Sequence, residues 1–272
     1  MNIQLPQDFI DQLNSAIDSD GIHLPFTAPI VWWKHGNKQL KATGDIRYYG
    51  GWATNAEEFY AAVGENGALP TGFVDGSFSG NDGEFAVYQT RKVCVAPIAT
   101  RKRWITMENS KGRSHLQMLC MLASQEDGHF ASWGPVVLSA KGLTTREIEN
   151  SFRTFDTVTA EIRKEIAPHI PTLYFWRFIG TFGKDPEFIK VGSGNNTSNV
   201  TYPTIYQPQE LNNDLVSSWF VGEEVAGKMV EYRNLAADWL NDDRWKQSKD
   251  SIDDTAMVDP NFAGGFMDDL PF

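Results

Sequence analysis

The chain has 272 residues, of which 41% are hydrophobic and 12% aromatic, and its formal net charge is −11. This composition supports a packed core and excludes an intrinsically disordered protein. No apolar run approaches about 18 residues, and the first residues lack a basic start followed by an apolar stretch, so we expect neither a membrane span nor a signal peptide. We expect Cys94 and Cys120 to be buried free thiols, with a disulfide or a metal site as the alternative.

The first third of the chain is predicted to hold two helices and two strands. Apolar residues recur on one face at helical spacing within residues 7–19. A His-Gly-Asn turn separates predicted strands at 28–34 and 38–49, and residues 55–63 form the second helix. Four glycines predict a loop over residues 71–83.

The middle of the chain is dense in predicted strands, which one long helix interrupts. Alternating apolar residues and turn signals place the first strands at 84–98, 101–108, 114–124 and 129–139. Thr144 and Glu147 match a capping box that begins a helix over residues 144–166. The remaining predicted elements are strands at 172–182, 187–191 and 202–206 and a long helix at 212–241.

Strands, one helix and then further strands is the order of an OB-fold, a small Greek-key β-barrel. We therefore predict a mainly β protein with added helices. Residues 1–241 would form a single domain, with the barrel core at about 84–206 and helical extensions at both ends. Another antiparallel α+β barrel or a sandwich is the alternative. Residues 242–272 are polar and acidic, which predicts a flexible C-terminal tail.

Charge is unevenly distributed along the chain. Residues 251–272 carry five Asp and no basic residue, whereas residues 85–115 hold seven Lys and Arg against one Glu. An acidic tail beside a basic stretch is informative about binding partners, because the basic stretch can attract a polyanion although the whole chain is acidic.

The last nine residues read Gly-Gly-Phe-Met-Asp-Asp-Leu-Pro-Phe. Phe272 combines a ring with the terminal carboxylate, so a partner can hold the ring in an apolar pocket and pair the carboxylate with a basic side chain. Asp268 and Asp269 add charge for steering, and Pro271, after Leu270, restricts the backbone. This ending resembles the C-terminal tip of bacterial and phage single-stranded-DNA-binding proteins (SSBs). A frayed terminus, or a Phe272 packed on the body, is the alternative.

The resemblance covers about six residues of the chain. It implies binding of single-stranded DNA in replication, recombination and repair, in the cytoplasm of a bacterial host, with replication and repair enzymes as partners of the tip. Bacterial members have a short N-terminal OB domain and a long linker rich in Gly, Gln and Pro. Here the predicted body is near 240 residues and the linker about 20, which favours a phage- or plasmid-encoded protein.

Single strands are held by basic grooves in which aromatic rings stack on bases. Two stretches combine both kinds of side chain. The first comprises Arg101, Lys102, Arg103 and Trp104, extended by Arg91, Lys92, Lys111 and Arg113. The second comprises Trp32, Trp33, Lys34, Arg47, Tyr48, Tyr49 and Trp52. Neighbouring residues on a strand point to opposite faces, so one member of each adjacent aromatic pair belongs to the core. Ordinary packing of the rings and a solvated basic face are the alternatives.

The sequence carries no HExxH, P-loop, GxSxG or Cys/His cluster. We therefore expect a non-enzymatic DNA-binding protein without a metal or other cofactor, as a monomer or homodimer. Two alternatives stay open. One is an accessory module of replication or recombination that binds partner proteins but not DNA, and the other is a nuclease.

Overall fold

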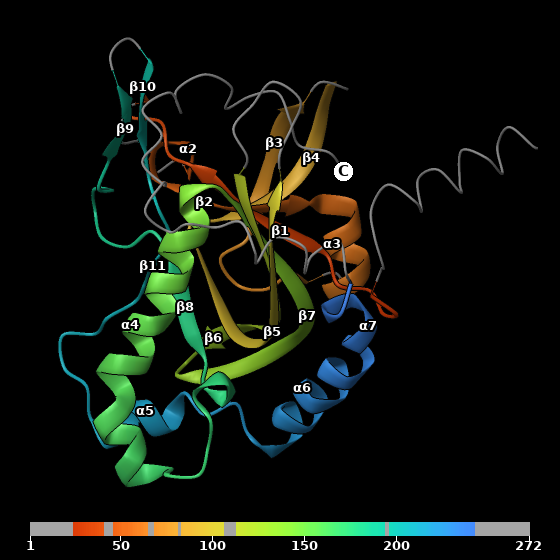
Figure 1. Ribbon diagram of the computed structural model, residues 1–272, viewed down its shortest axis with the longest axis vertical. Helices are drawn as coiled ribbons and strands as arrows, with labels where there is room; N and C mark the ends of the chain where they lie inside the picture. The colour runs from red at the N-terminus through yellow and green to blue at the C-terminus, as the bar shows by residue number, and fades with distance from the viewer. Residues whose placement is uncertain are drawn as a thin grey trace, which may run out of the picture.

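The computed structural model describes residues 24–40, 46–64, 68–80, 83–105, 113–193 and 196–242. Within them the protein is mainly β, with one large sheet and several helices (Figure 1). The strands are β1 (Ile30–His35), β2 (Gly50–Asn55), β3 (Val74–Gly80), β4 (Gly83–Thr90), β5 (Lys92–Ile105), β6 (Arg113–Glu126), β7 (His129–Lys141), β8 (Arg177–Gly180), β9 (Ile189–Ser193), β10 (Asn196–Val200) and β11 (Thr204–Ile205). The helices are α2 (Ile46–Tyr49), α3 (Ala56–Val63), α4 (Leu143–Ile166), a 3-10 helix (Thr172–Tyr174), α5 (Asn213–Ser218), α6 (Glu223–Leu235) and α7 (Ala237–Leu240).

The large sheet has nine strands in the order β11-β8-β5-β6-β7-β1-β2-β4-β3. Its centre is the antiparallel meander β5-β6-β7, whose strands have 13 or 14 residues each. β1 adds to this meander in parallel to β7, with Val31 opposite Leu138 and Trp32 opposite Ser139. β9 and β10 form a separate two-stranded hairpin.

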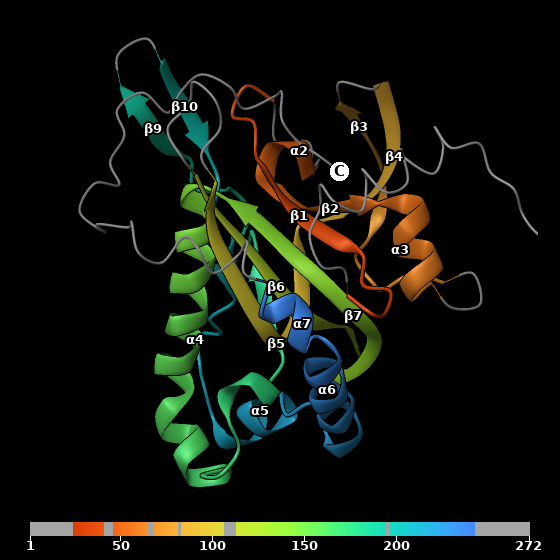
Figure 2. The same cartoon turned by 45° about the vertical axis from the view of Figure 1, so that its right-hand side comes forward.

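Both faces of the sheet bury apolar side chains. On β6, Leu116, Met118, Cys120 and Leu122 belong to a core that also contains residues of α3 and α4, and we call this side the inner face. The intervening residues, such as Met121, pack with residues of α6 and α7 on the outer face. Figures 1 and 2 show α6 in the lower part of the molecule and α7 nearer its middle, both below the β3–β4 hairpin. The helices therefore cover only part of the outer face.

Helix α4 follows the meander and packs on the inner face. Ile148, Phe152, Phe155 and Thr159 are buried at spacings of three and four residues, which is the pattern of one helical face. The predicted helix at 144–166 is confirmed. Its predicted capping box is wrong, because the helix begins at Leu143 and the Thr144 side chain is buried inside it.

The sheet is not closed by a continuous ladder, so the OB-fold barrel is not confirmed; the coarser prediction of a mainly β protein with added helices is. Side chains nevertheless bridge β2 to the region of β8. The Trp52 indole Nε1 donates to the Ile179 carbonyl at 2.9 Å, and Thr181 Oγ1 donates to the Gly50 carbonyl at 3.0 Å.

Two predictions for the N-terminal third differ from the structure. Residues 46–49 of the predicted strand 38–49 form α2, and the following strand begins at Gly50. The predicted loop at 71–83 contains β3, because pairing with β4 supplies the backbone hydrogen bonds that glycine-rich sequence alone does not favour. Phe78 of β3 also packs against Phe85 of β4, with ring centroids 5.4 Å apart.

Later boundaries differ as well. Residues 84–105 of the strands predicted at 84–98 and 101–108 are β4 followed by β5, the predicted strand at 172–182 is a 3-10 helix followed by β8, and the helix expected at 212–241 is three shorter helices. The predicted helix at 7–19 and residues 243–272 lie outside the described residues. The predicted tail at 242–272 begins one residue too early, because Asp242 is buried. Both cysteines are buried free thiols, as predicted, and burial raises the pKa of each. In the described part of the chain, no helix has the length and apolar character needed to cross a membrane.

Candidate nucleic-acid interface

The tryptophan pair on β1 is divided between the two faces of the sheet. Trp33 lies on the inner face, where its ring contacts the ring of Trp52 edge-on at 5.1 Å and its Nε1 donates to the Thr201 carbonyl at 3.0 Å. Trp33 and Trp52 are both buried. The prediction that one tryptophan of the pair is core is therefore confirmed, and Trp33 and Trp52 are not available to stack on bases.

Trp32 lies on the outer face together with two phenylalanines of the β3–β4 hairpin. Its ring meets Phe78 edge-on at 6.3 Å, and Phe78 in turn contacts Phe85. The Lys34 ammonium group lies 5.0 Å from the centre of the Phe78 ring, within the range of a cation–π contact. Trp32, Phe78 and Phe85, which we call the aromatic cluster, are only partly buried, and the Trp32 Nε1 has no hydrogen-bond acceptor among the described residues.

A row of basic residues crosses the same face beside the aromatic cluster. In the strand register, Arg103 of β5 lies opposite His115 of β6, and His115 lies opposite Lys141 of β7. Because Trp32 is aligned with Ser139, Lys34 continues this row two residues further along β1. We call Arg103, Lys141 and Lys34 the cation row. Neighbouring strands are about 4.8 Å apart, so the row spans roughly 14 Å.

His115 sits within this row without adding charge. Burial, followed by the nearby charges of Lys141, Arg103 and Arg101, lowers the pKa of His115 to about 3. The imidazole is therefore neutral at physiological pH, and its Nε2 lies 3.2 Å from Ser139 Oγ.

Arg101 and Lys102, predicted for the DNA surface, are engaged elsewhere. Arg101 is 8% exposed, and it donates to Gln117 Oε1 and to the Trp239 carbonyl. It lies 3.9 Å from the buried Asp242 carboxylate, so it fixes the end of α7 to the sheet. Lys102 pairs with Glu149 of α4 at 3.1 Å. The prediction of an open groove built from both residues differs from the structure, because one is buried and the other faces α4.

Arg91 and Lys92 lie at a second position, beside a hollow of about 500 Å³ lined also by Gln89, Thr181 and Phe182. The Arg91 guanidinium stacks on the Tyr49 ring at 3.7 Å and donates to the Gly183 carbonyl at 2.9 Å. Lys92 is exposed, with its ammonium group 5.1 Å from the Phe178 ring.

The other predicted residues fall into two groups. Arg47 is exposed on α2, and Tyr48 lies between Tyr49 and Phe188, in edge contact with both. Tyr49 itself is buried, so the second adjacent aromatic pair also places one ring in the core. Outside the described residues or side chains are Trp104, Lys111, Arg113 and the tip residues Asp268, Asp269, Leu270, Pro271 and Phe272.

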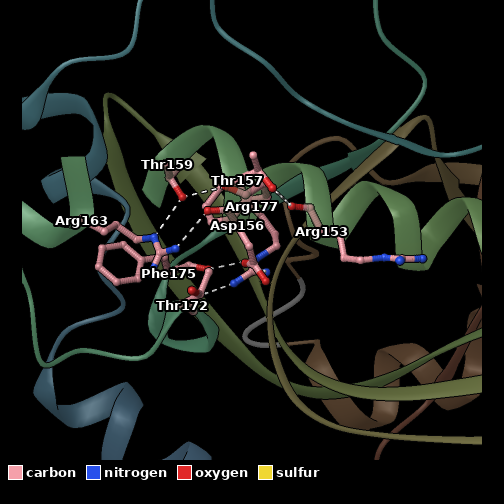
Figure 3. A network of polar contacts seen from close by, with 9 residues as sticks. Arg153, Asp156, Thr157, Thr159, Arg163, Thr172, Phe175 and Arg177 are labelled. Carbon is pink, nitrogen blue, oxygen red and sulfur yellow. Dashed lines mark hydrogen bonds and ion pairs between the residues drawn. The ribbon is translucent and has the colours of Figure 1, made fainter. Parts of the chain in front are cut away.

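A charged cluster that was not predicted lies under α4 (Figure 3). Arg177 is 3% exposed; its guanidinium donates to the carbonyls of Thr172 at 2.5 Å and Phe175 at 3.3 Å, and its Nη1 is 3.8 Å from Asp156 Oδ1. The guanidinium also lies 4.4 Å from the Phe155 ring. Burial lowers the pKa of Arg177 to about 10, although Asp156 opposes this shift. These contacts join α4 to β8 and serve the fold.

One sequence feature on β6 marks the outer-face site. On β6, the outer-facing positions change from Leu119 and Met121 to the polar Gln117 and His115. This change marks where the helices stop covering the sheet. Lys141 and Phe85 of this site are not among the residues predicted for DNA binding, and Phe78 lies in the predicted loop at 71–83.

No protein-family model, curated protein or solved structure matches this chain. Within the described ranges between residues 24 and 242, no three His, Cys, Asp or Glu side chains lie together as a possible metal site. The function is therefore inferred from the residues of this chain alone.

Proposed function

We propose that this protein binds single-stranded DNA, without strong sequence preference, on the outer face of its sheet. The observation that carries the proposal is the aromatic cluster lying beside the cation row. Every base has a face that can stack on an aromatic ring, and such stacking contributes roughly 1–3 kcal/mol per base. Cations along the same path neutralise phosphates, and the release of counterions makes the affinity depend on salt.

We also propose an OB-like barrel as the scaffold. The meander β5-β6-β7 is followed by α4 and then by β8, which pairs with β5. This order of strands and helix is that of an OB-fold, whose barrel binds oligonucleotides. The hydrogen bonds of Trp52 and Thr181 between β2 and the region of β8 support closure by side chains where no ladder joins these strands.

We propose further that the acidic tip recruits replication and repair enzymes in the cytoplasm of a bacterial cell, and that the protein is phage- or plasmid-encoded. Recruitment rests on the sequence of the last residues, Asp-Asp-Leu-Pro-Phe, and the phage or plasmid origin on the predicted body of near 240 residues with a linker of about 20. The Phe272 ring supplies recognition, and the two aspartates supply steering.

A fluorescence titration with oligo-dT tests the DNA-binding proposal, since nine tryptophans are present as reporters. Each phosphate that the cation row contacts should steepen the slope of log affinity against log salt by about 0.7. Lys34→Gln should weaken binding and reduce the slope by about 0.7. Lys228→Gln is the matched control, because this exposed lysine lies on α6 at the opposite end of the molecule (Figure 2).

Three results would contradict the proposal. Equal affinity for duplex and single strand would remove the stacking contribution. Loss of the oligonucleotide that requires Mg²⁺ would indicate a nuclease. Capture of a replication enzyme through the tip, with no binding of oligo-dT, would indicate an accessory module.

A further inference from the structure

Strand β3 forms one edge of the nine-stranded sheet, and among the described strands it pairs only with β4. Every second residue of an edge strand turns its backbone N–H and C=O groups away from its partner. Such an edge can accept another strand. The opposite edge, β11, offers only two residues, whereas β3 offers seven.

The sequence of β3 lacks the usual protection of an edge. Natural edge strands carry lysines, prolines or bulges that discourage pairing. Residues 74–80 read Val-Asp-Gly-Ser-Phe-Ser-Gly, with a single charge and no proline, and they pair with β4 without a register shift. Val74 is 56% exposed. The β3–β4 hairpin also projects at one end of the molecule, beyond α3 (Figures 1 and 2). An incoming strand can therefore reach this edge.

We propose that the partner is a second copy of this chain, joined by antiparallel pairing of β3 with β3 about Ser77. This register pairs all seven residues of the strand. It places Ser77 opposite Ser77, Asp75 opposite Ser79, and the Phe78 ring opposite Gly76. No like charges face one another, and the Phe78 ring of one copy lies opposite Gly76 of the other, over which the Gln89 side chain already lies. A parallel, in-register pair would instead place Asp75 against Asp75, which is unfavourable.

The symmetry of this pair has a structural consequence. In an antiparallel pair, directly opposite residues lie on the same face of the sheet. The two outer faces therefore become one continuous surface, with the aromatic cluster of each copy next to the seam. The association itself needs no DNA, so it goes beyond the proposed function and is tested without DNA.

A disulfide across the two-fold axis tests the register. Opposite Cα atoms in an antiparallel pair are about 4.5 or 5.5 Å apart, and disulfides form at about 4.4–6.8 Å. Ser77→Cys should therefore yield a covalent dimer under mild oxidation, visible on a non-reducing gel. Asp75→Cys is the matched control on the same strand, because the two Asp75 positions lie four residues apart along the seam, at about 13 Å. The native cysteines are buried and should not compete.

Sedimentation velocity without DNA tests the association itself. The unmodified protein should contain dimer at tens of micromolar, whereas Ser77→Glu and Ser77→Lys should each weaken the dimer by up to about fivefold. An equimolar mixture of the two variants should restore it, which also shows that both are folded. The proposal is overturned if the protein sediments as a monomer at about 100 µM, or if Ser77→Cys cross-links no faster than Asp75→Cys. A monomer that still binds oligo-dT would leave the proposed function intact.

Discussion

Alanine at Trp32 and phenylalanine at Trp52 should separate DNA binding from stability. Trp52 is fully buried and donates its indole hydrogen to Ile179. Trp52→Phe removes the hydrogen bond from the indole to the Ile179 carbonyl and part of the ring volume, so we expect the free energy of unfolding to fall by about 2–3 kcal/mol. Trp32 is only partly buried, and its indole Nε1 makes no hydrogen bond among the described residues. Trp32→Ala should lower stability by about 1 kcal/mol, the worth of one aromatic pair.

The two variants should rank in the opposite order for DNA. Trp32→Ala should weaken binding of oligo-dT by about 1–3 kcal/mol, which is roughly 5- to 150-fold, with the salt dependence nearly unchanged. Trp52→Phe should bind DNA almost as the unmodified protein does. Urea unfolding followed by circular dichroism gives the stabilities, and anisotropy of a labelled oligo-dT gives the affinities. If folded Trp32→Ala binds with full affinity, the aromatic cluster is ordinary packing and the proposed path of the strand is wrong.

Arg101→Met should lower the free energy of unfolding by about 3 kcal/mol in a urea titration, because the buried Asp242 loses this cation. A loss under about 1 kcal/mol would show that the contact between Arg101 and Asp242 does not stabilise the fold. Deleting residues 251–272 removes five aspartates and should raise the affinity for oligo-dT at low salt, with a gain that shrinks as salt increases. Removing Phe272 alone should leave DNA affinity unchanged. Equal low-salt affinities of the unmodified protein and the two deletion variants would contradict the idea that the tail competes with DNA. The pKa of His115 is about 3 in the folded protein, against 6.5 without burial. Because the unfolded chain therefore binds the proton more tightly, the free energy of unfolding should be unaffected by His115 above pH 6.5. It should fall by up to about 1.4 kcal/mol per pH unit as the pH decreases from 6.5 towards 3. His115→Gln should reduce the dependence of the free energy of unfolding on pH, measured by urea titrations between about pH 6.5 and pH 4. The same pH dependence in the variant and the unmodified protein would contradict this prediction.

The elements that the sequence predicted best are those whose pattern depends on one buried face. β6, β7 and α4 alternate or repeat clearly, and each was located to within a few residues. β3 escaped prediction because its stability comes from β4 and from the contacts of Phe78, neither of which is visible within a glycine-rich window. The long helix expected at 212–241 is broken near Gly222, whose φ of 82° suits glycine and does not fit an α-helix.

The sequence predicted that aromatic and basic side chains lie together in the candidate site, but it identified only some of the residues that do so. The rule that adjacent strand residues point to opposite faces correctly assigned one tryptophan of the β1 pair to the core. It gave no means of knowing that Arg101 is buried under α7, because Trp239 and Asp242 lie about 140 residues away in the chain. The cation row likewise depends on the register between β5, β6, β7 and β1, which only tertiary pairing fixes.

The parallel pairing of β1 with β7 has a consequence for synthesis of the chain. The strands β1, β2, β3 and β4 lie within residues 30–90 and can pair with one another early. β1 must then wait for β7, which ends at Lys141. At translation rates of roughly 5–20 residues per second, the interval is on the order of 5–20 s. During that time the edge of β1 that later pairs with β7 has no partner strand.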